Sequence, residues 1–105
     1  MKPVLFAISL FPAFVFAAEG DYSLAIRNHQ FVPDQLIIPA DKKIRLVISN
    51  EDSTPEEFES YTLNREKVIP GNSKASIYVG PLEAGTYEFI GEFHEATARG
   101  VIQAE

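Results

Sequence analysis

The apolar residues of this chain come in short alternating runs, each ended by a turn-forming residue. The runs lie at residues 22–27, 36–38, 44–49, 58–63, 67–69, 73–79, 87–91 and 101–102, and Pro, Gly, Asn and Asp lie between many of them. An apolar residue at every second position is the period of a strand with one buried face. No window after residue 20 has the helical period. The pattern predicts an all-β antiparallel domain of about seven or eight strands, folded as a two-sheet sandwich.

The first residues have the organisation of an export signal. Lys2 precedes an almost wholly apolar stretch at residues 3–16, and Val15-Phe16-Ala17 places small residues before a polar start. We expect a signal peptide at 1–17 and a mature domain at 18–105 in the periplasm, with no membrane insertion after cleavage. A membrane anchor is the alternative, but about 13 apolar residues are fewer than the roughly 20 that span a bilayer. The sequence leaves an uncleaved signal anchor open.

The net charge limits the classes of binding partner, and the cysteine count limits how the fold can be stabilised. The formal net charge is −6, which disfavours nucleic acid and anionic membranes and suits cations or a basic protein surface. The chain has no cysteine, so no disulfide can stabilise the exported domain. The hydrophobic core alone has to hold the fold.

Four motifs resemble those of plastocyanin-like cupredoxins. They are Phe31-Val32-Pro33-Asp34-Gln35-Leu36-x-Ile38, Ile44-x-Leu46-x-Ile48-x-Asn50-x-Asp52, Gly85-Thr86-Tyr87-x-Phe89 and Gly100-Val101-Ile102. Together they cover essentially the whole expected mature domain. The resemblance implies a Greek-key β-sandwich. It is greatest to the EfeO-type, cysteine-less branch, whose small periplasmic domains are associated with bacterial iron uptake.

The resemblance also places the family's four copper ligands on this chain. Glu56 stands where the first histidine would be, Gly91 where the cysteine would be, and Ala98 where the axial methionine would be. The second histidine is retained as His94. A type 1 blue-copper site needs a cysteine thiolate, so the resemblance here implies no site of that kind. The single methionine is Met1, within the expected signal peptide.

The residues that remain at this end are acidic and imidazole groups. Alternation with Phe58 turns Glu56 inward and leaves Glu57 and Glu59 facing outward. By the resemblance, Glu92 and His29 approach the same end. Carboxylate and imidazole suit Cu(II), Fe, Mn or Zn. We therefore predict a site for a copper or iron ion centred on Glu56 and His94, with Glu92 and His29 as outer candidates.

Plainer interpretations stay open for these residues. A run of glutamates is usually a solvated face, His94 could simply hydrogen-bond its own loop, and His29 could be a surface histidine. Three functions follow. The first is a periplasmic metal-binding accessory protein for iron or copper acquisition, whose partner is an iron permease or another periplasmic or membrane protein. The second is a ferroxidase helper with a non-blue copper site. The third is a metal-free interaction module. A role as an enzyme is the less favoured reading.

Overall fold

The computed structural model describes residues 21–105, and the predicted signal peptide at 1–17 lies outside them. Nine strands and one short 3-10 helix make up this part of the chain. They are β1 (Asp21–Arg27), β2 (Gln30–Val32), β3 (Gln35–Ile38), β4 (Ile44–Asn50), β5 (Glu56–Ser60), β6 (Arg65–Ile69), β7 (Ser73–Val79), β8 (Gly85–Gly91), η3 (Glu92–His94) and β9 (Arg99–Ala104). Within residues 21–105, no helix has the length and apolar character needed to cross a membrane.

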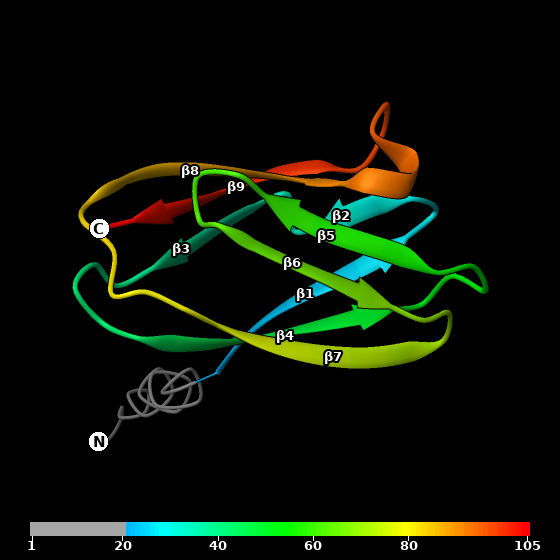
Figure 1. The fold of residues 1–105 in the computed structure, drawn as a ribbon, viewed down its shortest axis with the longest axis horizontal. Coiled ribbons are helices and arrows are strands. Elements are labelled where there is room, and N and C mark those ends of the chain that lie inside the picture. Colours follow the sequence, from blue (N-terminus) through cyan, green and yellow to red (C-terminus); the bar gives the residue numbers. More distant parts are fainter. Residues whose placement is uncertain (1–20) are drawn as a thin grey trace, which may run out of the picture.

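The strands form two sheets packed face to face (Figure 1). One sheet has the order β2-β1-β4-β7 and the other has the order β3-β9-β8-β5-β6. The all-β sandwich predicted from the sequence is therefore confirmed. The strand count is nine rather than seven or eight, because the three-residue β2 is too short to show a period of its own.

The antiparallel arrangement that the sequence predicts holds for most strand pairs but is wrong for two of them. β1 pairs with β4 in parallel, and β3 pairs with β9 in parallel. Both pairs arise because the chain crosses between the sheets: β3 leaves the sheet of β1 and β2, and β4 then returns to it. Apolar alternation reports which face of a strand is buried and carries no information on the direction of its neighbour.

The core lies between the two sheets and is built from the predicted alternation. β4 has the burial pattern of a strand with every second residue inside, so that Leu46 and Ile48 are fully buried. Phe31, Phe58 and Phe89 belong to this core and contact one another. Phe31 lies edge-on to the other two rings, at centroid distances of 6.1 Å from Phe58 and 4.9 Å from Phe89. Ile77 and Tyr87, which belong to two of the alternating runs, are only partly buried and pack against this core.

Three connections gather at one end of the sandwich. They are the β1–β2 turn, the β4–β5 loop and the segment from η3 to β9, and hydrogen bonds join them: His29 N donates to Asp52, and Thr97 donates to the carbonyl of His29. The candidate site lies at this end.

Candidate metal centre

Glu56 is a carboxylate inside the protein. It opens β5, and the alternation of that strand gives it the same inward direction as Phe58. Its relative exposure is 1%, so the predicted inward orientation is confirmed. Oε2 accepts hydrogen bonds from the backbone N–H groups of Glu57 at 3.1 Å and Phe93 at 2.9 Å. Burial of a carboxylate without such partners would be costly.

The other oxygen of Glu56 meets His94. The distance between Glu56 Oε1 and His94 Nδ1 is 2.6 Å. A nitrogen and an oxygen this close must share one proton, because two facing lone pairs would repel each other. His94 is the last residue of η3. In the turn that follows, the N–H of Ala98 donates a hydrogen bond to the carbonyl of His94 at 2.8 Å. The side chain of His94 is 29% exposed, so this pair connects the interior with the solvent.

His29 lies flat against His94. The two ring centroids are 3.6 Å apart and the ring planes differ by 8°. The sequence placed His29 near the site, and the structure brings it into direct contact. Imidazoles stacked in this way do not direct their in-plane lone pairs at a common point. In this arrangement, His29 covers one face of His94 instead of completing a ligand set around Glu56.

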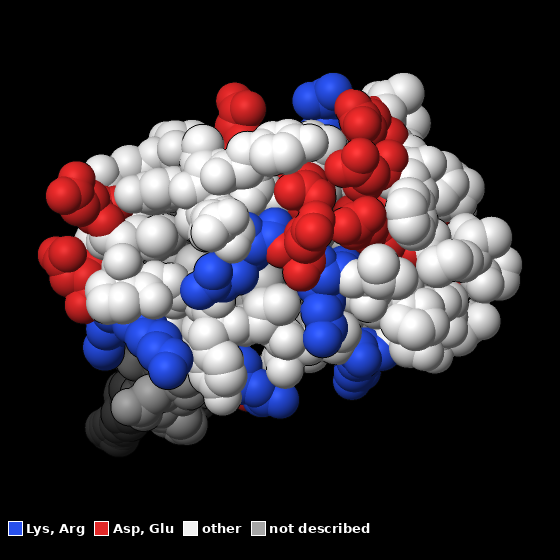
Figure 2. Space-filling model, viewed as in Figure 1, with Lys and Arg blue, Asp and Glu red and all other residues white. Residues whose placement is uncertain are grey.

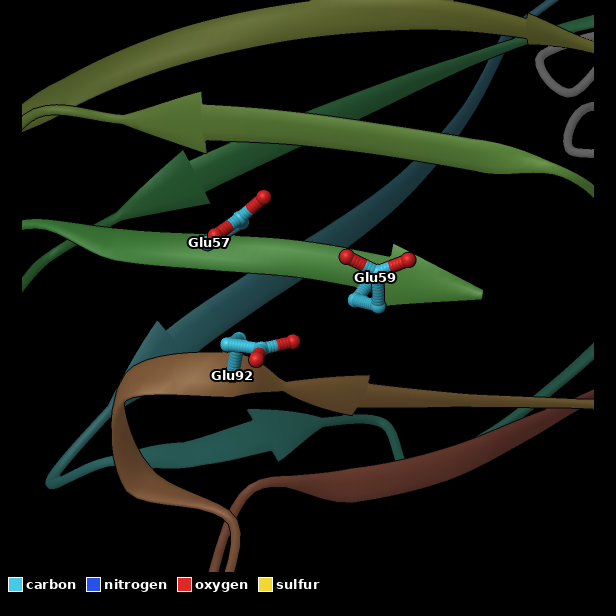
Figure 3. A group of neighbouring side chains, drawn as sticks. All are labelled: Glu57, Glu59 and Glu92. Atoms are coloured by element: carbon cyan, nitrogen blue, oxygen red, sulfur yellow. The ribbon is translucent and has the colours of Figure 1, made fainter. Parts of the chain in front are cut away.

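Glu92 belongs to a different group of side chains. Its carboxylate lies with those of Glu57 and Glu59, with one oxygen from each within 4.8 Å of the others. Figure 3 shows Glu57 and Glu59 on β5 and Glu92 on the segment that follows β8. The predicted outer candidates therefore separate: His29 contacts the Glu56–His94 pair, and Glu92 joins the outward-facing glutamates.

These outward glutamates repel one another. Glu59 pairs directly across the strands with Glu66, and Figure 2 shows acidic side chains gathered above a group of basic ones on this face. Partial desolvation, followed by the neighbouring carboxylate of Glu66, raises the pKa of Glu57. The same causes raise the pKa of Glu59. Like charges opposite each other destabilise a sheet.

A type 1 copper site does not fit these residues. A β-carbon added to Gly91, the cysteine place in the resemblance, would lie 2.6 Å from Cβ of Ala98 and 2.8 Å from Cδ of Glu56. Both distances are far below van der Waals contact. The carboxylate of Glu56 thus fills the space that a side chain at position 91 would need, and the described residues contain no thiol that could replace it.

Sequence reasoning missed Asp52 as a structural partner of the site. Its two carboxylate oxygens accept the backbone N–H groups of Asn28 at 2.8 Å and His29 at 2.9 Å. Burial alone would raise the pKa of Asp52, but these two hydrogen bonds outweigh it and lower the pKa below its usual value. Asp52 follows Asn50 in the resemblance motif, yet nothing local in the sequence connects it to a turn 23 residues earlier.

Comparison with protein families agrees with the architecture. The family model described as "Cupredoxin-like domain" matches residues 3–104. Uncharacterized protein RP394 of Rickettsia prowazekii (strain Madrid E) is 44% identical over 82 residues, which cover 78% of this chain. The aligned region spans 66% of the length of that relative.

Solved structures with the same fold include several copper proteins. Amicyanin from Paracoccus versutus has a TM-score of 0.64 at 14% identity, with 83% of each chain covered. The purple cupredoxin from Nitrosopumilus maritimus has a TM-score of 0.63 at 18% identity, covering 81% of this chain and 100% of its own. Auracyanin A, the "blue" copper protein of Chloroflexus aurantiacus, has a TM-score of 0.68 at 12% identity, covering 81% of this chain and 98% of its own. At these identities the likeness concerns the fold.

Proposed function

The chain belongs to the cupredoxin-like domain family, and from this membership and the geometry of its site we propose that it is an exported metal-binding accessory protein that serves iron or copper acquisition. The metal is a copper or iron ion held by Glu56 and His94 outside the type 1 class. Nitrogen and oxygen donors of this kind suit Cu(II) and iron, among other ions.

One observation carries the proposal: a carboxylate with 1% exposure lies 2.6 Å from the Nδ1 atom of the retained histidine. An interior built for stability alone would place an apolar side chain at position 56, because a hydrogen-bonded polar pair in the interior seldom stabilises a fold more than well-packed apolar side chains do. The pair also lies at the end of the sandwich, where His94 is partly open to solvent.

Metal titration of the purified protein tests this proposal. We expect Cu(II) or iron to bind with a 1:1 stoichiometry, and His94→Ala and Glu56→Gln each to weaken binding at least about tenfold, or roughly 1.4 kcal/mol. Glu83→Gln is the matched control, because it removes a charge from the exposed connection between β7 and β8, at the opposite end of β8 from His94. Equal affinity in all three variants would refute a site at Glu56 and His94.

An ion held between Glu56 and His94 must also break the hydrogen bond that they share. The proton on Nδ1 then moves to Nε2 of the same ring or leaves to solvent, because ligands bind metals in their deprotonated forms. Binding should therefore shift or broaden the NMR signals of the His94 ring. Unchanged His94 signals at saturating metal would mean that the ion binds elsewhere.

The role in iron acquisition rests on the resemblance to the iron-uptake branch and is tested separately. We expect the gene to lie beside one for an iron permease or another membrane transporter, and its deletion to impair growth under iron limitation. An Fe(II) oxidation assay on the copper-loaded protein distinguishes a ferroxidase helper from a carrier. Intact-mass measurement of the exported protein tests cleavage after Ala17.

A metal-free interaction module is the second candidate, and one observation favours it. Both oxygens of Glu56 already have hydrogen-bond partners among protein groups, so the carboxylate needs no cation to be stable where it lies. Absence of binding for Cu(II), Zn(II) and both iron oxidation states at micromolar concentration would favour this candidate.

A further inference from the structure

The turn that carries His29 has an unusual backbone. Asn28 and His29 connect β1 to β2 with φ values of 52° and 59°, and the flanking residues Arg27 and Gln30 are paired. A two-residue hairpin turn with both φ values positive is the type that favours glycine at its second position. Histidine adopts a positive φ more readily than most residues but less readily than glycine, so contacts that hold the turn favour it at this position.

Side chains from two other connections hold this turn in place. Asp52, in the β4–β5 loop, accepts the N–H groups of Asn28 and His29 with one oxygen each. Thr97, between η3 and β9, donates its hydroxyl to the carbonyl oxygen of His29 at 2.6 Å. Both backbone polar groups of His29 are therefore bound by side chains from outside its hairpin.

Asp52 is itself fixed at both ends of its backbone. Its N–H donates to Oδ1 of Asn50 at 3.0 Å, and its carbonyl accepts the N–H of Asn72 at 2.8 Å. The relative exposure of Asn50 is 1%. The contacts thus form a continuous path from the interior, through Asp52, to the backbone of His29.

These contacts fix the position of the imidazole ring of His29. With its backbone bound on both sides, His29 lies parallel to His94 at 3.6 Å. The stacked ring blocks one face of His94 and opposes rotation of that ring away from Glu56. Groups that orient a metal-binding histidine commonly change its affinity for metal by 10–100-fold.

We propose that Asp52 and Thr97 are positioning residues that clamp His29 over His94, and that His29 acts through the stack to keep Nδ1 of His94 directed at Glu56. The clamp joins three connections that are far apart in the sequence. This inference rests on the proposed metal-binding function for its effect on affinity, whereas the position of the ring can be measured without metal.

The test compares variants of the clamp in the metal-free protein and with Cu(II) alone as the probe. His29→Ala should shift the NMR signals of the His94 ring protons, because it removes the ring stacked on them, and Asp52→Asn should reproduce much of that shift. Both variants should weaken Cu(II) binding about tenfold. The double variant His29→Ala with Asp52→Asn should bind Cu(II) no more weakly than His29→Ala alone, because Asp52 and His29 act through one contact, the stacking of His29 on His94.

Two controls separate positioning from charge and from folding. Glu51→Gln removes the same charge from the same loop, where Glu51 contacts Arg27 and not His29, and it should leave the His94 signals unchanged. Thr97→Ser keeps the hydroxyl and should behave as wild type, whereas Thr97→Val should behave as Asp52→Asn. Thr97 also lies 3.5 Å from the carbonyl oxygen of His94 through its hydroxyl. Thr97→Val should therefore also be made in the His29→Ala protein, where it should change the His94 signals no further, and this comparison still decides the matter if Asp52→Asn fails to fold.

Unchanged His94 ring signals in both Asp52→Asn and Thr97→Val would overturn the clamp. Wild-type protein that binds no Cu(II) or iron would instead overturn the proposed function, and the NMR comparison would then still decide whether the clamp exists. Additive losses of affinity in the double variant would show that Asp52 acts independently of His29, and would also overturn the inference.

Discussion

Replacing Glu56 with leucine or with glutamine should separate the two things that its carboxylate does. Leucine has a similar volume but accepts no hydrogen bond, so the N–H groups of Glu57 and Phe93 and Nδ1 of His94 lose their partner. Glutamine can still accept both backbone hydrogen bonds with its carbonyl oxygen. Its amide can also donate to Nδ1 of a neutral His94.

The magnitudes follow from counting these groups. An unsatisfied buried donor costs about 1–3 kcal/mol. Glu56→Leu leaves two backbone N–H groups without an acceptor, and both hydrogen bonds that they lose are part-buried. We therefore expect the free energy of unfolding to fall by about 2–4 kcal/mol. Glu56→Gln loses only the charge-assisted part of the hydrogen bonds and should lose about 1 kcal/mol. In a domain of this size, 1 kcal/mol corresponds to about 4–8 °C in Tm.

Urea denaturation followed by circular dichroism at pH 7, without added metal, measures both values. The denaturant slope should stay constant, since a change in slope would indicate an altered denatured or native state. A leucine variant as stable as the glutamine variant would refute the reasoning. It would show that water reaches the two N–H groups and that the carboxylate is not needed to satisfy them.

Three further predictions concern the surroundings of the pair. Gly91→Ala should lower the free energy of unfolding by about 1–3 kcal/mol in thermal melts, because overpacking forces its neighbours aside, and a neutral result would mean that Ala98 and Glu56 can move. Glu59→Gln should raise Tm at pH 7 in low salt. The pKa of Glu59 is raised in the folded protein, so the protonated carboxyl contributes stability that is fully present below the usual pKa of 4.5. This stability is lost as the pH rises through the raised pKa. That gain should shrink in 1 M NaCl, where the Debye length is about 3 Å; a gain independent of salt would contradict a repulsive origin. The Cu(II)-loaded protein should show no strong absorption near roughly 600 nm, because that charge-transfer band requires a thiolate, and a strong band would refute the assigned site.

The sequence predicts the centre of the site better than its surroundings. Glu56 could be placed because alternation within a strand fixes the direction of a side chain relative to Phe58. His94 could be located because its motif resembles that of the cupredoxins. Both predictions depend on short stretches of chain in which each residue constrains the next.

The positions of His29, Asp52 and Glu92 could not be predicted in the same way. The stacking of His29 on His94 depends on hydrogen bonds between connections that are remote in sequence. Glu92 begins η3 instead of continuing β8, so strand alternation no longer determines its direction. The parallel pairs β1–β4 and β3–β9 could not be predicted for a related reason. The relative direction of two strands depends on how the chain crosses between the sheets and not on the local pattern of residues.

The tight packing at Gly91 affects how a protein of this kind could change into a blue-copper protein, or arise from one. A cysteine at position 91 would collide with the carboxylate of Glu56 and with Ala98, whereas a histidine at position 56 alone would find no thiolate beside it. The two kinds of centre are therefore separated by intermediates that form neither. Conversion to a blue-copper centre would require positions 56 and 91 to change together, with Ala98 making way. In that direction a cysteine at position 91 alone is opposed by steric exclusion, whereas in the opposite direction the loss of the cysteine meets no clash and only removes the thiolate.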